Sequence, residues 1–444
     1  MDVFIIKAGQ LILSLSILVV LHELGHFVPA KLFKTRVEKF YLFFNPWFSL
    51  FKIKRGGTEY GIGWLPLGGF VKISGMIDES MDRNQLKRPA QPWEFRAKPA
   101  WQRLIIMIGG VVVNLIVGAV CFTLVVYVWG QKKVELSSLY NGMYVSEVLE
   151  PYGLETGDMV VSIEGKDVKS IEWLNEEVLF FGGRNLEVKK PNGEFTNVRL
   201  PEDIDYEIVG GGARSGVFSV PIPVIADSVV AGMPAEAAGL VKGDSIVSVN
   251  GENTPYWPDF VGAITNSQGK VDLVVVRDSE KLILNMTPNV VEGKKMIGIS
   301  AVMGYTNWYT VTHDKYSFVK SVPVGVANAM RKLWANVLSF KFVFTKKGAS
   351  QMGGMISIGN MFPAMWNWQI FWYMTGMLSL VLAFMNILPI PALDGGHVVF
   401  LLYEIVVGKK PHEKVLEYAQ IGGMVLLFGV MLLANGNDIV KLFN

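Results

Sequence analysis

The sequence predicts a multi-pass α-helical membrane protein with four transmembrane helices, a membrane-associated β-region and two tandem β-rich domains. Three observations support this fold class. Hydrophobic residues make up 51% of the 444 residues, whereas only 18% are charged. Four apolar runs are long enough to cross a bilayer, because about 20 helical residues span its hydrocarbon core. Between the second and third runs, a β-rich pattern bounded by glycines occurs twice.

Four segments are predicted to be transmembrane helices, at residues 1–30, 104–130, 363–403 and 415–436. The first run lacks a small-residue cleavage site after a short apolar core, so we expect a retained helix rather than a signal peptide. The other segments of the helical part are a β-region with a loop at 31–103, a loop at 404–414 and a tail at 437–444.

Composition excludes some partners and leaves others open. A net charge of +2 gives no case for a nucleic-acid partner. The single cysteine, Cys121, lies inside an apolar run, so a disulfide framework is impossible. The chain is expected to act as a monomer in the lipid bilayer.

Lysine and arginine are concentrated in two connections, which predicts the orientation of the helices. Residues 31–103 contain "KLFKTRVEK", "FKIKR" and "LKRP", and the loop at 404–414 contains Lys409, Lys410 and Lys414. Loops rich in these residues stay in the cytoplasm. Both termini and the long region between the second and third helices are therefore predicted on the outer side.

The long outer region contains an internal repeat. "GLETGDMVVSIEG" at 153–165 aligns with "GLVKGDSIVSVNG" at 239–251, an offset of 86 residues. The second copy, with "AGMPAEAAGLVKGDSIVSVNG", resembles the core of PDZ domains, so tandem PDZ-like domains are expected at 131–220 and 221–305. The first copy has "LEPYGL" where the second has "VAGMPAEAAGL", which predicts a helix that is shortened or lost. Residues 306–362 follow, mixing apolar and basic residues at helical spacing, and are expected to form amphipathic helices at the outer membrane surface.

The end of the first apolar run reads "VVLHELGHFVP". His22 and His26 are four residues apart, so a helix places both on one face. This H-E-x-x-H arrangement presents two imidazoles to one Zn²⁺ and places the Glu23 carboxylate to polarise a metal-bound water. The alternative is a pair of interfacial histidines that cap a helix. Ionisable groups at membrane depth are costly and usually functional, which favours the metal site.

A catalytic zinc needs a third protein ligand and an open position for water. The candidates outside the first helix are Asp394, His397, His313, His412 and Glu404. The last three are expected in the outer region or on solvated surface. Asp394 lies in "NILPIPALDGGH", where the broken backbone requires protein or a water-filled cavity to satisfy it. We therefore favour Asp394, while a cap for a helix beginning at Gly395 and a ligand role for His397 are the alternatives.

"HELGHF", "NILPIPALDGG" and the PDZ-like modules between them resemble the site-2 protease family, and most closely its bacterial regulator of sigma-E protease subfamily. The resemblance covers nearly the whole chain. It implies one catalytic Zn²⁺ bound by His22, His26 and Asp394, with Glu23 as the base.

The resemblance also implies residues beyond the metal site. Asn386 and Pro391 match the family's substrate-contacting Asn and Pro, although Asn386 could instead bond another helix and Pro391 could only shape its loop. Asn114 falls where the family has an Asn in its second span. Gly109-Gly110 stands where the family has Gly-Pro.

The implied activity is cleavage of transmembrane segments of membrane proteins whose ectodomains a first protease has trimmed. The implied substrates are single-pass proteins such as a trimmed anti-sigma factor in envelope stress signalling, and signal-peptide remnants. The implied location is the bacterial inner membrane, with the PDZ-like domains periplasmic and the active site toward the cytoplasm.

A helical substrate must unwind before cleavage, and its freed backbone groups then need partners. Residues 57–73, "GTEYGIGWLPLGGFVKI", predict short strands and turns. An edge of such a strand could pair with the extended substrate. The predicted contact positions are Gly61, Gly63, Gly68 and Gly69. The two outer domains are expected to act as a gate that excludes bulky ectodomains.

Overall fold

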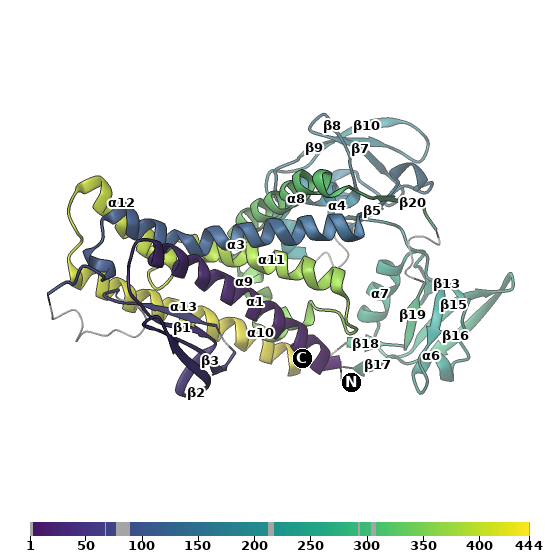
Figure 1. Cartoon of the computed structure of the whole chain (residues 1–444). Helices are drawn as coiled ribbons and strands as arrows, with labels where there is room; N and C mark the ends of the chain where they lie inside the picture. The colour runs from purple at the N-terminus through teal and green to yellow at the C-terminus, as the bar shows by residue number, and fades with distance from the viewer. Residues whose placement is uncertain are drawn as a thin grey trace. The chain divides into compact units, whose positions relative to one another are not determined.

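The computed structural model describes residues 3–66, 68–76, 89–211, 217–291, 294–302 and 308–443, which form two compact units (Figure 1). The helical unit comprises Met1–Gly130, Lys315–Val337 and Met352–Asp438. The β-rich unit comprises Gln131–Asp314, Leu338–Gln351 and Ile439–Asn444.

Among the described residues, four helices are long and apolar enough to cross a membrane, as the sequence predicted. They are α1 (Val3–Leu32), α3 (Ala100–Trp129), α11 (Trp368–Ile387) and α13 (Glu413–Phe443). The segment predicted at 363–403 is interrupted where its prolines and glycines indicated a broken backbone: α11 is followed by α12 (Asp394–Val407), because Pro389 and Pro391 cannot continue a helix. The segment expected as a tail at 437–444 is helical up to Phe443.

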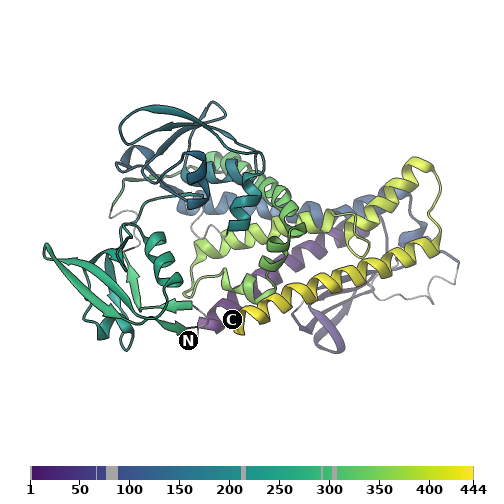
Figure 2. The ribbon, with the colours of Figure 1, turned by 180° about the vertical axis from the view of Figure 1, so that it is seen from behind.

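Helix α3 packs against α1, α11 and α12, and Figure 2 shows these helices running alongside one another from the opposite side. Lipid provides no hydrophobic force between helices, so close packing and hydrogen bonds hold them together. Thr375 on α11 donates to Ser14 Oγ on α1 at 3.0 Å. Ser379 on α11 donates to the carbonyl of Asn114 on α3 at 2.7 Å. These bonds fix α11 against both neighbours.

A four-stranded sheet in the order β2-β3-β1-β4 follows α1. Its strands are β1 (Val37–Leu42), β2 (Phe44–Arg55), β3 (Thr58–Leu65) and β4 (Phe70–Ile73). The strands and turns expected over 57–73 are present. Leu67 and residues 77–88 of the following loop lie outside the described residues. Strand β3 pairs on both sides, so Gly61 and Gly63 lie inside the sheet and not on an open edge. Among the described strands β4 pairs only with β1, which leaves its other edge open.

The sheet is fixed to the helices by a small apolar core. Ile73 at the end of β4 lies in one buried cluster with Ala30 of α1, Ile106 of α3 and Val398 of α12. A short 3-10 helix, η1 (Phe95–Ala97), adds Phe95 to the same cluster. The cluster therefore fixes the end of β4 beside three helices.

Helix α8 (Phe318–Ser339) is amphipathic, as expected for part of 306–362. One stripe of exposed apolar side chains recurs every fourth residue, at Phe318, Val322, Val326, Met330 and Trp334, and Val319 is exposed beside it. The opposite face buries small residues, and Gly325 packs against Thr123 of α3. The remaining elements of this region are η5 (Phe340–Phe344), α9 (Lys346–Gln351) and α10 (Met355–Asn360).

The β-rich unit contains two modules of one topology, each with a four-stranded sheet, in the orders β10-β9-β7-β8 and β16-β15-β13-β14. Module 1 contains η2 (Leu136–Ser138), β6 (Tyr144–Val145), η3 (Glu147–Tyr152), β7 (Met159–Ile163), β8 (Lys166–Asp167), α4 (Ile171–Leu179), β9 (Asn185–Lys189), β10 (Phe195–Arg199), α5 (Ile204–Gly211) and β11 (Phe218–Ser219). Module 2 contains β12 (Ala226–Val229), α6 (Pro234–Ala237), β13 (Ser245–Val249), β14 (Glu252–Asn253), α7 (Trp257–Asn266), β15 (Val271–Arg277), β16 (Glu280–Met286), β17 (Asn289–Val291), β18 (Lys294–Met296) and β19 (Ile299–Ala301). Residues 212–216, 292–293 and 303–307 of the predicted domains lie outside the described residues. Strands β5 (Gln131–Val134) and β20 (Val311–Asp314) pair with each other.

The repeat is visible in the elements themselves. Strands β7 and β13 begin 86 residues apart, at Met159 and Ser245, and share one burial pattern. The helix that was expected to be shortened or lost in the first copy is present as the six-residue 3-10 helix η3, at the position of α6. In both copies the aspartate of the Gly-Asp turn is buried and ion-paired: Asp158 pairs with Lys190 and Asp244 with Arg277. Hydrogen bonds from Arg277 hold the pKa of Asp244 below its usual value.

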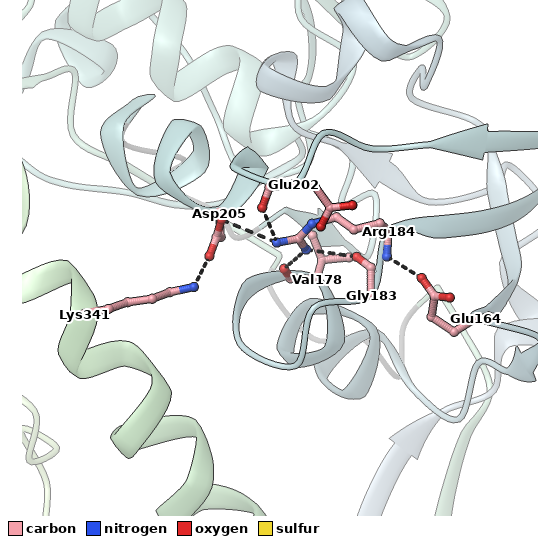
Figure 3. A network of polar contacts seen from close by, with 7 residues as sticks. All are labelled: Glu164, Val178, Gly183, Arg184, Glu202, Asp205 and Lys341. Atoms are coloured by element: carbon pink, nitrogen blue, oxygen red, sulfur yellow. Dashed lines mark hydrogen bonds and ion pairs between the residues drawn. The ribbon is translucent and has the colours of Figure 1, made fainter.

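A buried ion network connects the η5 segment to module 1 (Figure 3). Asp205, 1% exposed, lies 3.4 Å from the Arg184 guanidinium and accepts a hydrogen bond from Lys341 on η5. The guanidinium also donates to the carbonyls of Val178, Gly183 and Glu202. Since Arg184 is itself buried, Asp205 neutralises a charge that has little contact with water.

Replacing Asp205 by Asn should destabilise module 1, because removing one partner of a buried ion pair costs about 3–5 kcal/mol. Thermal unfolding of the full-length protein, with hydrogen exchange of residues 171–211, measures the effect. Asp227→Asn is the matched control, because the Asp227–Lys242 pair is exposed and such pairs contribute little. Equal behaviour of the two variants would show that the network does not stabilise the module.

Candidate metal centre

Three side chains from α1 and α12 converge within the helical unit. His22 and His26 lie on one face of α1, and Asp394 is the first residue of α12. The two imidazole Nε2 atoms are 3.3 Å apart, and each lies 3.4 Å from Asp394 Oδ2. All three side chains are largely buried. Among the described residues, this is the one His, Cys, Asp and Glu group that could hold a metal ion.

The spacing of these atoms fits a zinc ion. Ligand atoms at about 2.0–2.1 Å from a tetrahedral zinc lie roughly 3.3–3.5 Å from one another. Asp394 Oδ2 is buried and has no hydrogen-bond partner among the described residues, which leaves a cation as the group that would satisfy it. Two nitrogens and one oxygen fill three positions and leave the fourth for water, as catalytic zinc sites require.

The outer ring nitrogens of both histidines are held by α3. His26 Nδ1 lies 2.8 Å from the carbonyl of Ile106, so Nδ1 carries the hydrogen and Nε2 is left to bind metal. His22 Nδ1 lies 3.1 Å from the Asn114 side-chain amide. If Asn114 Oδ1, which is buried and otherwise without a partner, accepts this hydrogen, His22 Nε2 is also directed to the metal.

The loop between α11 and α12 presents Asp394 to the histidines. Ala392 has a φ of 84°, a strained conformation for a residue with a side chain, and such strain is often found at functional sites. Helix α12 begins at Asp394, with Leu393 as its N-cap and no side-chain capping bond. Asp394 is therefore not the cap of a helix beginning at Gly395, and its carboxylate is directed to the two imidazoles.

Gly110 explains how α3 can approach so closely. A β-carbon at Gly110 would lie 2.4 Å from His26 Nε2 and 2.6 Å from His22 Cε1. The neighbouring Gly109 lies against Gly25 of α1, backbone to backbone. The Gly109-Gly110 pair thus provides the space in which the two imidazoles lie.

The other predicted ligands are arranged differently. His397 lines the same cavity as the three ligands but does not belong to their cluster. His412 lines a second cavity of about 580 Å³, and Glu404 forms an ion pair with Arg103. His313 lies on β20, opposite Lys132 of β5.

A cavity of about 490 Å³ surrounds the three ligands. Glu23, Asn386, Gly69 and all four residues of β4 line it. The Asn386 amide nitrogen lies 3.4 Å from His22 Nε2, beside the metal position. A β-carbon at Gly69 would lie 2.5 Å from Val19 Cγ1, so Gly69 allows β4 to begin directly against α1.

Some predicted substrate contacts are not part of this cavity. The residues that line it do not include Gly61, Gly63, Gly68 or Pro391. Pro391 lines the second cavity instead. Conversely, sequence reasoning missed Gln420, which lines both cavities. The signal for it was an amide near the start of the apolar stretch predicted as the fourth transmembrane helix.

Comparison with known proteins agrees with this geometry. The family model described as peptidase family M50 matches residues 10–430. The regulator of sigma E protease of Haemophilus influenzae is 27% identical, over 99% of this chain and 100% of its own length. A Xylella fastidiosa protein named as a candidate zinc metalloprotease is 28% identical, over 98% and 99% of the two chains. A Treponema pallidum protein with the same name is 27% identical, over 98% of each chain.

Substituting Gly110 by Ala should reduce bound zinc and abolish turnover, because its methyl group would displace two imidazoles held by α3. Zinc content of purified protein, measured by atomic emission, checks this. Gly9→Ala on α1 is the control, because a β-carbon there meets nothing within 4 Å. Normal zinc content in Gly110→Ala would contradict the packing argument.

Proposed function

We propose that this chain, which belongs to peptidase family M50, hydrolyses peptide bonds within the transmembrane segments of other membrane proteins. It is a zinc metalloprotease, and the described part of the chain contains four helices long and apolar enough to span a membrane. One observation carries the proposal: His22, His26 and Asp394 form a zinc-shaped cluster within these apolar helices. An ionisable cluster in such surroundings is costly and indicates function at membrane depth.

The chemistry is divided between the metal and Glu23. Zinc, when bound, supplies a Lewis acid that polarises a carbonyl and lowers the pKa of water. Glu23 lines the cavity next to His22 in sequence but lies outside the ligand cluster. It would accept the proton of the attacking water and donate it to the leaving amine. The Asn386 amide would hold the substrate beside the reacting carbonyl.

The open edge of β4 supports a mechanism for substrate unwinding. A peptide bond in a helix is shielded by its own hydrogen bonds, so cleavage requires an extended segment. Strand β4 lines the catalytic cavity along its whole length, and its edge away from β1 is open among the described strands. A substrate strand added there would satisfy part of its backbone and lie beside the metal ligands.

The substrates we propose are single-pass membrane proteins already trimmed outside the membrane, among them anti-sigma factors and signal-peptide remnants. The similarity to a regulator of sigma E protease supports this substrate class. Lys and Arg in 31–103 and 404–414 support a cytoplasmic position for these loops in the bacterial inner membrane. The two modules would then be periplasmic PDZ-like domains that act as a size gate, and the protein would work as a monomer.

Replacing Glu23 by Gln should leave zinc bound and reduce cleavage by about 10²–10⁴-fold, because the residue serves as a base and not as a ligand. Zinc analysis and a cleavage assay with a membrane-protein substrate measure both quantities. Asp394→Ala should instead lose zinc and activity together, and His397→Ala should keep its zinc. Full activity of Asp394→Ala would refute the ligand assignment.

Removing the modules should permit cleavage of substrates that still carry an ectodomain, if the modules are a size gate. Gln131 and Asp314 are paired across β5 and β20, so a short Gly-Ser linker can replace residues 132–313. Zinc content of this variant shows whether the helical unit is intact. A zinc-loaded variant that still requires trimmed substrate would disprove the gate.

A further inference from the structure

Helix α13 buries very little of its surface. Of the side chains described on this helix, only Gln420, Gly423 and Asp438 are buried. Asp438 accepts hydrogen bonds from the backbone and hydroxyl of Ser357, which accounts for its burial. Gln420 and Gly423 lie three residues apart, on one face.

Gly423 fixes where this face lies. A β-carbon at Gly423 would come within 1.5 Å of the carbonyl oxygen of Pro391, so the helix backbone presses directly on the loop between α11 and α12. Gln420 lies one turn before this contact, toward the N-terminus of α13. Its side chain is therefore held at the edge of the loop that presents Asp394.

The Gln420 side chain lines the catalytic cavity, and no described residue is its hydrogen-bond partner. The residue is only 6% exposed and lines both the catalytic cavity and the second cavity. Among the described residues, none forms a hydrogen bond with its amide. The amide atoms are not fully enclosed by protein, so a group that enters the cavity can hydrogen-bond them. An extended peptide in the cavity would supply the partner that no described residue supplies.

The unwound substrate of the proposed function is the group that needs such an amide. A strand added to β4 uses only the backbone groups that face β4, and the groups on its other edge face away. Backbone groups of α13 bond within the helix and offer nothing to this edge. A glutamine amide both donates and accepts, so it can serve an N–H and a C=O of an extended chain.

We propose that Gln420 is a substrate-binding residue that hydrogen-bonds the backbone of the unwound substrate, opposite β4. This inference rests on the proposed function. Met76, His397 and Gln420 line both cavities, so the two cavities adjoin at this point. Gln420 therefore holds the segment that leaves the metal centre toward the second cavity. Because it contacts backbone and not side chains, its contribution is independent of substrate sequence.

The test is a double-mutant cycle on binding rather than on turnover. The probe is a synthetic apolar peptide of about 20 residues, enough to span a bilayer, with glycines at its centre. In a peptide series, an ester replaces one backbone amide at a time and removes one N–H. Each peptide is titrated against Glu23→Gln protein in detergent, with and without Gln420→Met, which preserves side-chain length and removes the amide.

Gln420→Met should weaken binding of the all-amide peptide roughly 2- to 12-fold, the range of one net hydrogen bond. For one peptide of the ester series, Gln420→Met should not weaken binding further, because the ester has already removed the N–H that the Gln420 amide would bond. Tyr418→Phe, two residues away and 71% exposed, should leave affinity unchanged. Equal losses for Gln420→Met at every ester position, unchanged affinity, or loss of zinc would each overturn the proposal.

This design separates the two hypotheses. Binding to the Glu23→Gln protein reports on Gln420 whether or not the peptide is a substrate. Cleavage of the same peptide by the parent protein reports on the proposed function. A positive cycle without cleavage would retain the Gln420 contact and reject intramembrane hydrolysis of this peptide class.

Discussion

The close approach of α1 and α3 is the constraint on which the metal centre depends. Lipid offers polar groups no partners, so each buried nitrogen and oxygen of the site must be satisfied by a neighbouring helix. Ile106 and Asn114 provide these partners from α3, and they reach the imidazoles only because Gly109 and Gly110 bring no side chains. The close contact between the backbones of α1 and α3 therefore determines both the packing of these helices and the orientation of the two imidazoles.

The interrupted helix provides the third ligand by the same logic. A continuous helix through 388–393 would satisfy its own backbone hydrogen bonds, but it would not direct the Asp394 carboxylate toward α1. Two prolines end α11, and Ala392 adopts a strained conformation before α12 begins. Glycines at 396 and 423 let the broken backbone pack against its neighbours without side chains between them. The strain is maintained by this packing.

Sequence patterns predicted what depends on local spacing. The four apolar helices, the His22–His26 pair and the 86-residue repeat each follow from periodicity or composition within one segment. The sequence could not show that Gly61 and Gly63 lie within the sheet, because strand order depends on pairing between distant segments. The first-copy helix was misjudged for a related reason: "LEPYGL" lacks the expected α-helical length, yet it forms a 3-10 helix at the equivalent position. Gln420 was missed because an isolated amide within an apolar stretch carries no periodic signal.

The polar side chains of the helical unit fall into two classes: those that bond within the protein and those that we propose contact the substrate. Ser14, Thr375 and Ser379 bond within the protein, and their contribution is to helix packing. The Asn114 amide bonds His22 and so belongs to the metal centre. Asn386 and Gln420 differ, because both amides line the cavity, although the Asn386 amide nitrogen also lies 3.4 Å from His22 Nε2 of α1. Asn386 lies beside the metal position, whereas Gln420 lies where the two cavities adjoin, so under the proposed mechanism the pair would line the path of an extended chain. In the proposed mechanism, three external sources would replace the internal hydrogen bonds of a substrate helix: the edge of β4 and the two side-chain amides. A membrane interior favours such an exchange only if the partners are already in place, and both amides already line the catalytic cavity.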